Sequence, residues 1–149
     1  MKEGAYANKK ALRIVMLTTV RFNRSKGGIE KVMINMANEM SDRGHQVTIV
    51  YRDGNGDEPG FPLKDKVKKV NCAAVQTPIL LRGFARNLRS LSFTAEEFHR
   101  KNAYLKLKAM ASRFKNAIER IEADVYITYE PKLTCMLLHE FKTTKPIVT

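Results

Sequence analysis

Two adjacent glycines, Gly27 and Gly28, precede a segment with the apolar periodicity of a helix, an arrangement that can bind phosphate. The first backbone N–H groups of a helix have no partner within the helix, and the helix dipole attracts negative charge to them. Glycine lets a ligand approach the backbone closely, because no Cβ stands in the way. The pair can equally serve only to turn the chain into the helix, so both interpretations stay open.

The cysteines and the ends of the chain narrow the class of protein. Cys72 and Cys135 are too few for a disulfide framework, and no Cys/His cluster has the spacing of a zinc site. The N-terminus lacks the apolar core of a secretion signal, and no apolar run approaches the roughly 18 residues of a membrane span. We therefore expect no metal, unreactive free thiols and a reducing, cytoplasmic setting.

The positive charge of the chain is unevenly distributed. The 149 residues carry 27 Lys+Arg and 15 Asp+Glu, a formal net charge of +12, and residues 79–115 hold nine basic and two acidic residues. Within that stretch, residues 79–93 combine an apolar helical face with three arginines and no acid, which fits docking on an anionic membrane surface. The predicted membrane-facing residues are Arg82, Phe84, Arg86 and Arg89. The alternative is that the apolar face of this segment covers the core.

The elements that must position the glycines form an alternating pattern of strands and helices. The continuous apolar run at 14–17 is typical of a strand buried on both faces of a parallel sheet, and residues 47–51 are predicted as a second strand. Further strands are predicted within 67–75, at 125–129 and from residue 146, with helices ending near residue 122 and beginning at Pro131. The fold class is therefore α/β, a Rossmann-like doubly wound parallel sheet spanning 12–149 after a disordered tail at 1–11.

The helix after the glycines is the best defined of these elements. Gly44 lies just past its expected end, as is usual for a helix C-terminus. Glu30 is expected on the polar face, and the helix should bury one apolar stripe made of Ile29, Val32, Met33, Met36, Ala37 and Met40. In the second half of the chain, Leu133, Leu137, Leu138 and Phe141 are expected to pack against the sheet.

The pattern stops at a strand with no helix after it, so we expect the sheet to be incomplete at the C-terminus and the chain to be a piece of something longer. A nicotinamide site is disfavoured. Asp53 follows the second strand, where an acid can hold a ribose hydroxyl, but the G-x-G-x-x-G fingerprint is absent and the loop before the first helix is too long for its tight turn.

Three parts of the sequence together resemble the N-terminal domain of family 4 glycosyltransferases, retaining enzymes of the GT-B fold. The first is the strand at 14–16, the second is Gly27-Gly28-Ile29-Glu30 with its helix, and the third is the run from Asp42-Arg43-Gly44-His45 through Val50. Residues 124–129 and 145–149 resemble later strands of that domain, although Tyr129-Glu130 stands where the family often has histidine or an apolar residue. The resemblance covers roughly 12–53 and 123–149.

The resemblance implies a domain that faces a cleft with a donor-binding C-terminal domain, which is absent here, so the fragment alone should be inactive. It implies transfer of a sugar from a nucleotide-sugar, a substrate rather than a cofactor, to a glycolipid or polysaccharide precursor. Gly27 and Gly28 would offer N–H groups to the donor phosphates. No catalytic residue can be assigned, because the family's usual histidine lies beyond the last strand, and His45 belongs to a structural turn.

Several charged residues near the expected cleft have two interpretations each. Arg21, Arg24 and Lys26 either meet an anionic acceptor or are solvated loop charges. Glu30 either favours the helix start through its charge or touches sugar hydroxyls. Tyr129 and Glu130 follow the carboxyl end of a strand and face the same cleft, where Glu130 either binds hydroxyls or caps the next helix.

Two other functions remain as alternatives. In the first alternative, the chain is one subunit of a split glycosyltransferase whose catalytic half is a separate chain. In the second, it is a basic nucleic-acid-binding α/β domain. The charge permits nucleic-acid binding, but no recognised motif or aromatic stacking platform accompanies it, so nucleic acid is not an expected partner. The expected location is cytoplasmic, with peripheral docking at the inner face of the cell membrane.

Overall fold

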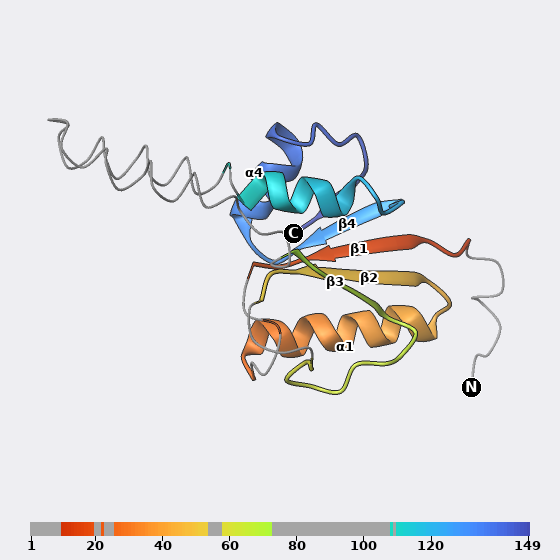
Figure 1. The fold of residues 1–149 in the computed structure, drawn as a ribbon. Helices are drawn as coiled ribbons and strands as arrows, with labels where there is room; N and C mark the ends of the chain where they lie inside the picture. The colour runs from red at the N-terminus through yellow and green to blue at the C-terminus, as the bar shows by residue number, and fades with distance from the viewer. Residues whose placement is uncertain (1–9, 20–21, 23–25, 54–57, 73–107, 109) are drawn as a thin grey trace, which may run out of the picture.

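The computed structural model describes residues 10–19, 22, 26–53, 58–72, 108 and 110–149. Their central feature is a five-stranded sheet with the order β3-β2-β1-β4-β5, in which every neighbouring pair is parallel (Figure 1). The expected α/β class with a parallel sheet is confirmed. The strands are β1 (Arg13–Leu17), β2 (Gln46–Tyr51), β3 (Lys68–Asn71), β4 (Val125–Thr128) and β5 (Ile147–Val148).

Helices cover both faces of this sheet, as a Rossmann-like arrangement requires. Figure 1 shows α1 (Gly28–Asp42) on one face and α4 (Pro131–His139) on the other, together with a helix whose described part covers 110–118. One core cluster joins α1 to Ile14, Met16 and Ile49, and a second joins the other two helices to Val15, Leu17 and Val50. Alternate residues of β1 and β2 thus point into different cores, which explains why both strands are largely apolar and why the run from Ile14 to Leu17 is continuous.

The end of α1 confirms the role expected for Gly44. This residue has φ +87°, in the left-handed region that favours glycine. The Gly44 N–H bonds to the Ser41 carbonyl at 3.1 Å, and the His45 N–H bonds to the Met40 carbonyl at 3.1 Å. This pair of hydrogen bonds is the Schellman arrangement, which satisfies carbonyls that the helix itself leaves without partners.

The buried face of α1 differs from the predicted stripe. Met33 and Ala37 are buried as expected, but Ile29 and Val32 are 42% and 51% exposed. The buried set is instead Glu30, Met33, Ile34, Ala37 and Ser41. The helix is rotated so that Ile34 packs on the sheet, and this rotation carries Glu30, expected on the polar face, to the inside.

Two details of the second half also differ from expectation. Leu138 is 52% exposed rather than packed on the sheet, and Met136 takes the inward position beside Leu137. The helix over 110–118 ends at residue 118 and a turn follows it, so this helix is shorter than predicted, since its expected end was near residue 122. Pro131 occupies the first turn of α4, as predicted.

Among the residues that the structure describes, no helix is long and apolar enough to cross a membrane. The predicted membrane-facing residues Arg82, Phe84, Arg86 and Arg89, and residues 1–9 of the predicted tail, lie outside the described residues.

Candidate functional site

The strand order creates a topological switch point at the carboxyl ends of β1 and β4. The chain runs from β1 to β2 and β3 on one side, and then returns to β4 and β5 on the other side. The loops that leave β1 and β4 therefore diverge to opposite faces of the sheet, and crevices at such switch points bind ligands in doubly wound folds. Gly27 and Gly28 end the first of these loops, and Tyr129 and Glu130 form the second. The structure thus brings these four predicted site residues to one edge.

Glu130 connects the two loops across this switch point. Its Oε1 accepts a hydrogen bond from the backbone N–H of Thr19 at 2.6 Å and a long one from the Thr18 hydroxyl at 3.4 Å. Its Oε2 accepts a hydrogen bond from the Thr19 hydroxyl and lies 2.7 Å from Lys132 Nζ. The carboxylate is therefore occupied by protein groups and holds the loop after β1 in position.

The protonation of Glu130 follows from these contacts. Partial burial raises the pKa of Glu130, but the hydrogen bonds from Lys132 and from the Thr19 side chain and backbone outweigh it, so its pKa lies below the usual range. The carboxyl group stays ionised at neutral pH. Glu130 is the N-cap residue of α4 by position but makes no side-chain cap, so the helix-capping interpretation is wrong.

The two glycines at the start of α1 differ in their surroundings. Among the residues that the structure describes, no atom lies within 4 Å of a Cβ built on Gly28, whereas a Cβ on Gly27 would clash with Glu30 Oε2. Glu30 is only 3% exposed, and its carboxylate lies back over the first turn of the helix. There the helix dipole favours its charge. This position supports the helix-start interpretation of Glu30 over contact with sugar hydroxyls.

Tyr129 lines a hollow beside the switch point. The hollow has a volume of about 660 Å³, within the range of small-molecule sites. It is lined by Met36, Ile127, Thr128, Tyr129, Glu130, Pro131, Thr134, Cys135, Val148 and Thr149. Burial raises the pKa of Tyr129 to about 12, and its hydroxyl contacts the Met36 sulfur at 3.3 Å. A neutral phenol held against a thioether is suited to packing against a ligand rather than to proton transfer.

No family model and no curated protein matches this sequence. Lys26 is exposed beside Gly27, while Arg21 and Arg24 lie outside the described residues. The part of the chain that the structure describes contains no group of three or more His, Cys, Asp or Glu residues placed to hold a metal ion.

Sequence reasoning missed one residue that shapes this edge. Phe22, in the loop after β1, is fully buried, and its ring centroid lies 4.7 Å from that of Tyr51. Asp53, considered above only for a ribose hydroxyl, is 5% exposed just after β2, and its backbone N–H and carbonyl bond the Asn71 side chain at 3.2 and 2.8 Å. A lone aromatic residue in a polar loop was the only available signal for Phe22.

The two cysteines provide a test of how open the hollow is. Burial raises the pKa of Cys72 to about 11, whereas Cys135 is exposed and lines the hollow. At pH 8 only about one Cys72 in a thousand is a thiolate, the reactive form. We expect iodoacetamide to modify Cys135 and to leave Cys72 intact until urea unfolds the chain. Mass spectrometry of the native protein checks this, with Cys135→Ser as the control that should remain unmodified.

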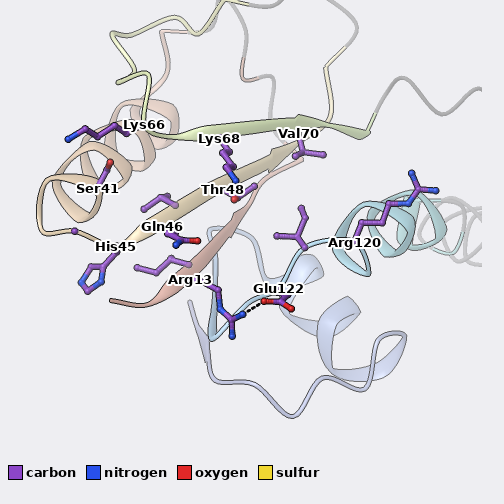
Figure 2. Close-up of a pocket in the computed structure, with 14 residues that line it drawn as sticks. Arg13, Ser41, His45, Gln46, Thr48, Lys66, Lys68, Val70, Arg120 and Glu122 are labelled. Atoms are coloured by element: carbon purple, nitrogen blue, oxygen red, sulfur yellow. Dashed lines mark hydrogen bonds and ion pairs between the residues drawn. The ribbon is translucent and has the colours of Figure 1, made fainter. Parts of the chain in front are cut away.

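A second hollow lies at the opposite, amino edge of the sheet (Figure 2). Its volume is about 600 Å³, and it is formed by the starts of β1, β2 and β3 and by the turn after the helix over 110–118. Its lining residues include Lys66, Lys68 and Arg120. None of the sequence-predicted site residues lies there.

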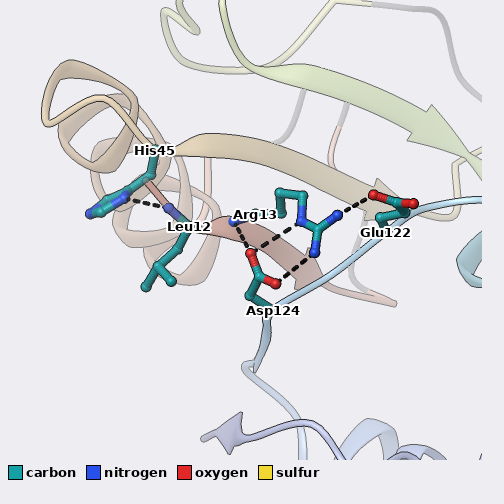
Figure 3. Close-up of polar contacts among 5 residues, drawn as sticks. All are labelled: Leu12, Arg13, His45, Glu122 and Asp124. Carbon is teal, nitrogen blue, oxygen red and sulfur yellow. Dashed lines mark hydrogen bonds and ion pairs between the residues drawn. The ribbon is translucent and has the colours of Figure 1, made fainter. Parts of the chain in front are cut away.

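Polar contacts near this amino edge join the two halves of the sheet (Figure 3). The Arg13 guanidinium is 2.7 Å from Asp124 Oδ1 and also pairs with Glu122. The hydrogen bonds from Arg13 hold the pKa of Asp124 well below its usual range. The Leu12 N–H donates to His45 Nδ1 at 3.1 Å. His45 therefore fastens the start of β1 to the turn after α1, which supports the structural role expected for it.

Proposed function

We propose that the chain is the N-terminal domain of a glycosyltransferase that moves a sugar from a nucleotide-sugar to a glycolipid or polysaccharide precursor. The observation that carries this proposal is the N-terminus of α1 at the switch point, where no atom of the described residues lies within 4 Å of a Cβ built on Gly28. A diphosphate is a suitable ligand there, because N–H groups without helical partners and the helix dipole both favour negative charge. The family 4 resemblance of the Gly27-Gly28-Ile29-Glu30 segment supports the same ligand.

In this proposal the backbone N–H groups of Gly27 and Gly28 stabilise the charge that develops on the diphosphate as it leaves the sugar. Exposed Lys26 adds positive charge beside them. Glu30 and Glu130 act as positioning residues, because one carboxylate lies over the helix start and the other is bonded to Thr19. The hollow beside Tyr129 is the proposed place for the acceptor. Transfer itself is proposed to need a second, donor-binding domain.

Gly28 allows a direct test of the N–H donor role. It is the first residue of α1, and Gly27 before it is extended, with φ −77° and ψ 168°. Proline is favoured at this helix position and after an extended residue, so Gly28→Pro removes the N–H while keeping the helix start. We expect Gly28→Pro to weaken binding of UDP, GDP or ADP, whichever the wild type binds, by about tenfold, roughly 1.4 kcal/mol.

Gly28→Ala is the matched control, because it adds a Cβ as proline does but keeps the N–H group. Isothermal titration calorimetry gives the affinities, and thermal unfolding shows whether each variant keeps the stability of the wild type. Equal affinity in Gly28→Pro and wild type would contradict the proposal, as would the absence of any nucleoside diphosphate binding in the wild type.

A further inference from the structure

The hollow at the amino edge lies over polar residues at the start of β2 and β3, on a face of the sheet whose later residues in the same strands are apolar. On β2 and β3, Val50 and Val70 pack with the core of the helices over 110–118 and α4. Two residues earlier on the same face stand Thr48 and Lys68, which are register partners. Figure 2 shows the Lys68 side chain extending beside Thr48 within the hollow. The sheet therefore offers an ammonium group and a hydroxyl where a core position would be apolar.

The charges around this hollow are not balanced. Lys66, Lys68 and Arg120 line it, and among the residues that the structure describes none of these three has an ion-pair partner. The one lining carboxylate, Glu122, is already paired with Arg13, whose guanidinium also bonds Asp124. Three positive side chains thus border the hollow, and Figure 2 shows Lys68 near its centre, beside Thr48, with Lys66 and Arg120 at its opposite ends and their charged groups turned away from the centre.

The nearby helix ends oppose anion binding, but by less than these cations favour it. The C-termini of α1 and of the helix over 110–118 both approach this edge, and each carries roughly half a negative charge. Two such ends amount to about one negative charge against three positive side chains. At the end of α1, the N–H groups of Gly44 and His45 also bond two of the carbonyls. The balance of charge remains positive.

From this cluster we infer that the amino-edge hollow binds a ligand through a multiply charged phosphate group, such as a diphosphate. Lys68 supplies the charge that contacts the phosphate, the hydroxyl of Thr48 and the amide of Gln46 supply hydrogen-bond donors, and Lys66 and Arg120 add positive potential from the two ends of the hollow. A volume of about 600 Å³ accommodates a diphosphate together with the group that bears it. The site is separate from the proposed donor site, which lies at the opposite edge of the sheet.

Lys68 and Lys69 form a matched pair for testing this inference. Both are exposed and adjacent on β3, but successive side chains of a strand point to opposite faces, and Lys69 does not line the hollow. We expect Lys68→Gln to raise the dissociation constant of inorganic pyrophosphate about tenfold, while Lys69→Gln changes it less than about twofold. Titration calorimetry at constant ionic strength measures both, and thermal unfolding confirms that each variant is folded.

Backbone amide NMR shifts of the full chain locate the pyrophosphate. Shifts at Gln46, Thr48 and Lys68 that Lys68→Gln abolishes support the inference. Equal losses in the two lysine variants, shifts only at Gly27 and Gly28, or no binding would overturn it. Shifts confined to the two glycines would at the same time support the proposed donor site, so the two proposals fail separately.

Vesicles identify the source of the phosphate. Once Lys68-dependent pyrophosphate binding is found, the wild type and both lysine variants are sedimented with phosphatidic acid vesicles. Neutral phosphatidylcholine vesicles serve as the control. Lys68-dependent sedimentation identifies a lipid headgroup as the ligand, and its absence identifies a soluble phosphorylated compound.

Discussion

Replacing Phe22 by alanine is expected to lower the free energy of unfolding by about 3–5 kcal/mol, the usual cost of removing a buried phenylalanine. Phe22 has no exposed surface, and it packs in the same core cluster as Met33 and Ile34 of α1. Its ring also meets that of Tyr51 with a centroid separation of 4.7 Å and a tilt of 38°. Such aromatic pairs add about 0.5–1.5 kcal/mol beyond the burial of area.

The position of Phe22 makes this change relevant to the proposed site as well. Phe22 fastens the loop between β1 and α1 to the core, and that loop ends at Gly27 and Gly28. We therefore expect Phe22→Ala to weaken nucleoside diphosphate binding even at temperatures at which the variant remains folded. Phe22→Leu should show a smaller loss of both stability and binding, because it keeps most of the apolar volume.

Thermal unfolding followed by circular dichroism measures the stability effect. For a chain of this size, the expected loss corresponds to a fall in Tm of about 10–15 °C. Leu138→Ala is the control, because Leu138 is 52% exposed and its truncation should stay within about 0.5 kcal/mol of the wild type. A Phe22→Ala variant that melts within about 2 °C of the wild type would show that this ring does not anchor the loop.

The sheet was predictable from the sequence, because each central strand is buried on both faces. Residues 14–17 form a continuous apolar run and residues 47–51 are apolar except for Thr48, and the two segments are parallel neighbours in the sheet. The limits of α1 were also predictable, since Gly27 and Gly44 have backbone roles at its two ends. These are local signals that require no knowledge of the tertiary contacts.

The orientation of α1 was not predictable in the same way. Ile29, Val32, Met33 and Ile34 are all apolar, so more than one helical stripe was available, and only packing on the sheet selects Met33 and Ile34. Glu30 reaches the inside as a consequence of that choice, and no property of the carboxylate itself indicates it. Hydrophobic periodicity therefore predicted the helix correctly but its inner face only in part.

The candidate site was less predictable than the helices and strands, because its residues are brought together by the order of the strands in the sheet. Thr19 and Glu130 are 111 residues apart in the sequence, and they meet only because β4 pairs with β1. The sequence indicated that Glu130 follows the carboxyl end of a strand, but not that this strand would lie next to the glycine loop. Strand order creates the switch point, and strand order is a property of the whole sheet.

The hydrogen bonds between Thr19 and Glu130 predict that replacing Glu130 by glutamine also has a large effect on stability. The Glu130 side chain is 12% exposed and accepts hydrogen bonds from the Thr19 N–H and hydroxyl. Glutamine keeps the shape but removes the charge, so we expect the free energy of unfolding at pH 7 to fall by about 2 kcal/mol, the range of hydrogen bonds to charged groups. Lys132 contributes little of this, because its side chain is 49% exposed and such pairs are worth less than about 1 kcal/mol.

The pH dependence separates a charge effect from a packing effect. Because the pKa of Glu130 is lowered in the folded protein, its contribution is fully present above the pKa of the unfolded chain and is lost as the pH falls through the folded value. The stability difference between wild type and Glu130→Gln should therefore be constant from pH 6 to 8 and shrink toward zero as the medium becomes strongly acidic. Urea unfolding at a series of pH values measures it, with Glu140→Gln, an exposed carboxylate at the end of α4, as the control. A difference that stays constant into strong acid would contradict this prediction, because it would show that the lost stability does not come from the charge of Glu130.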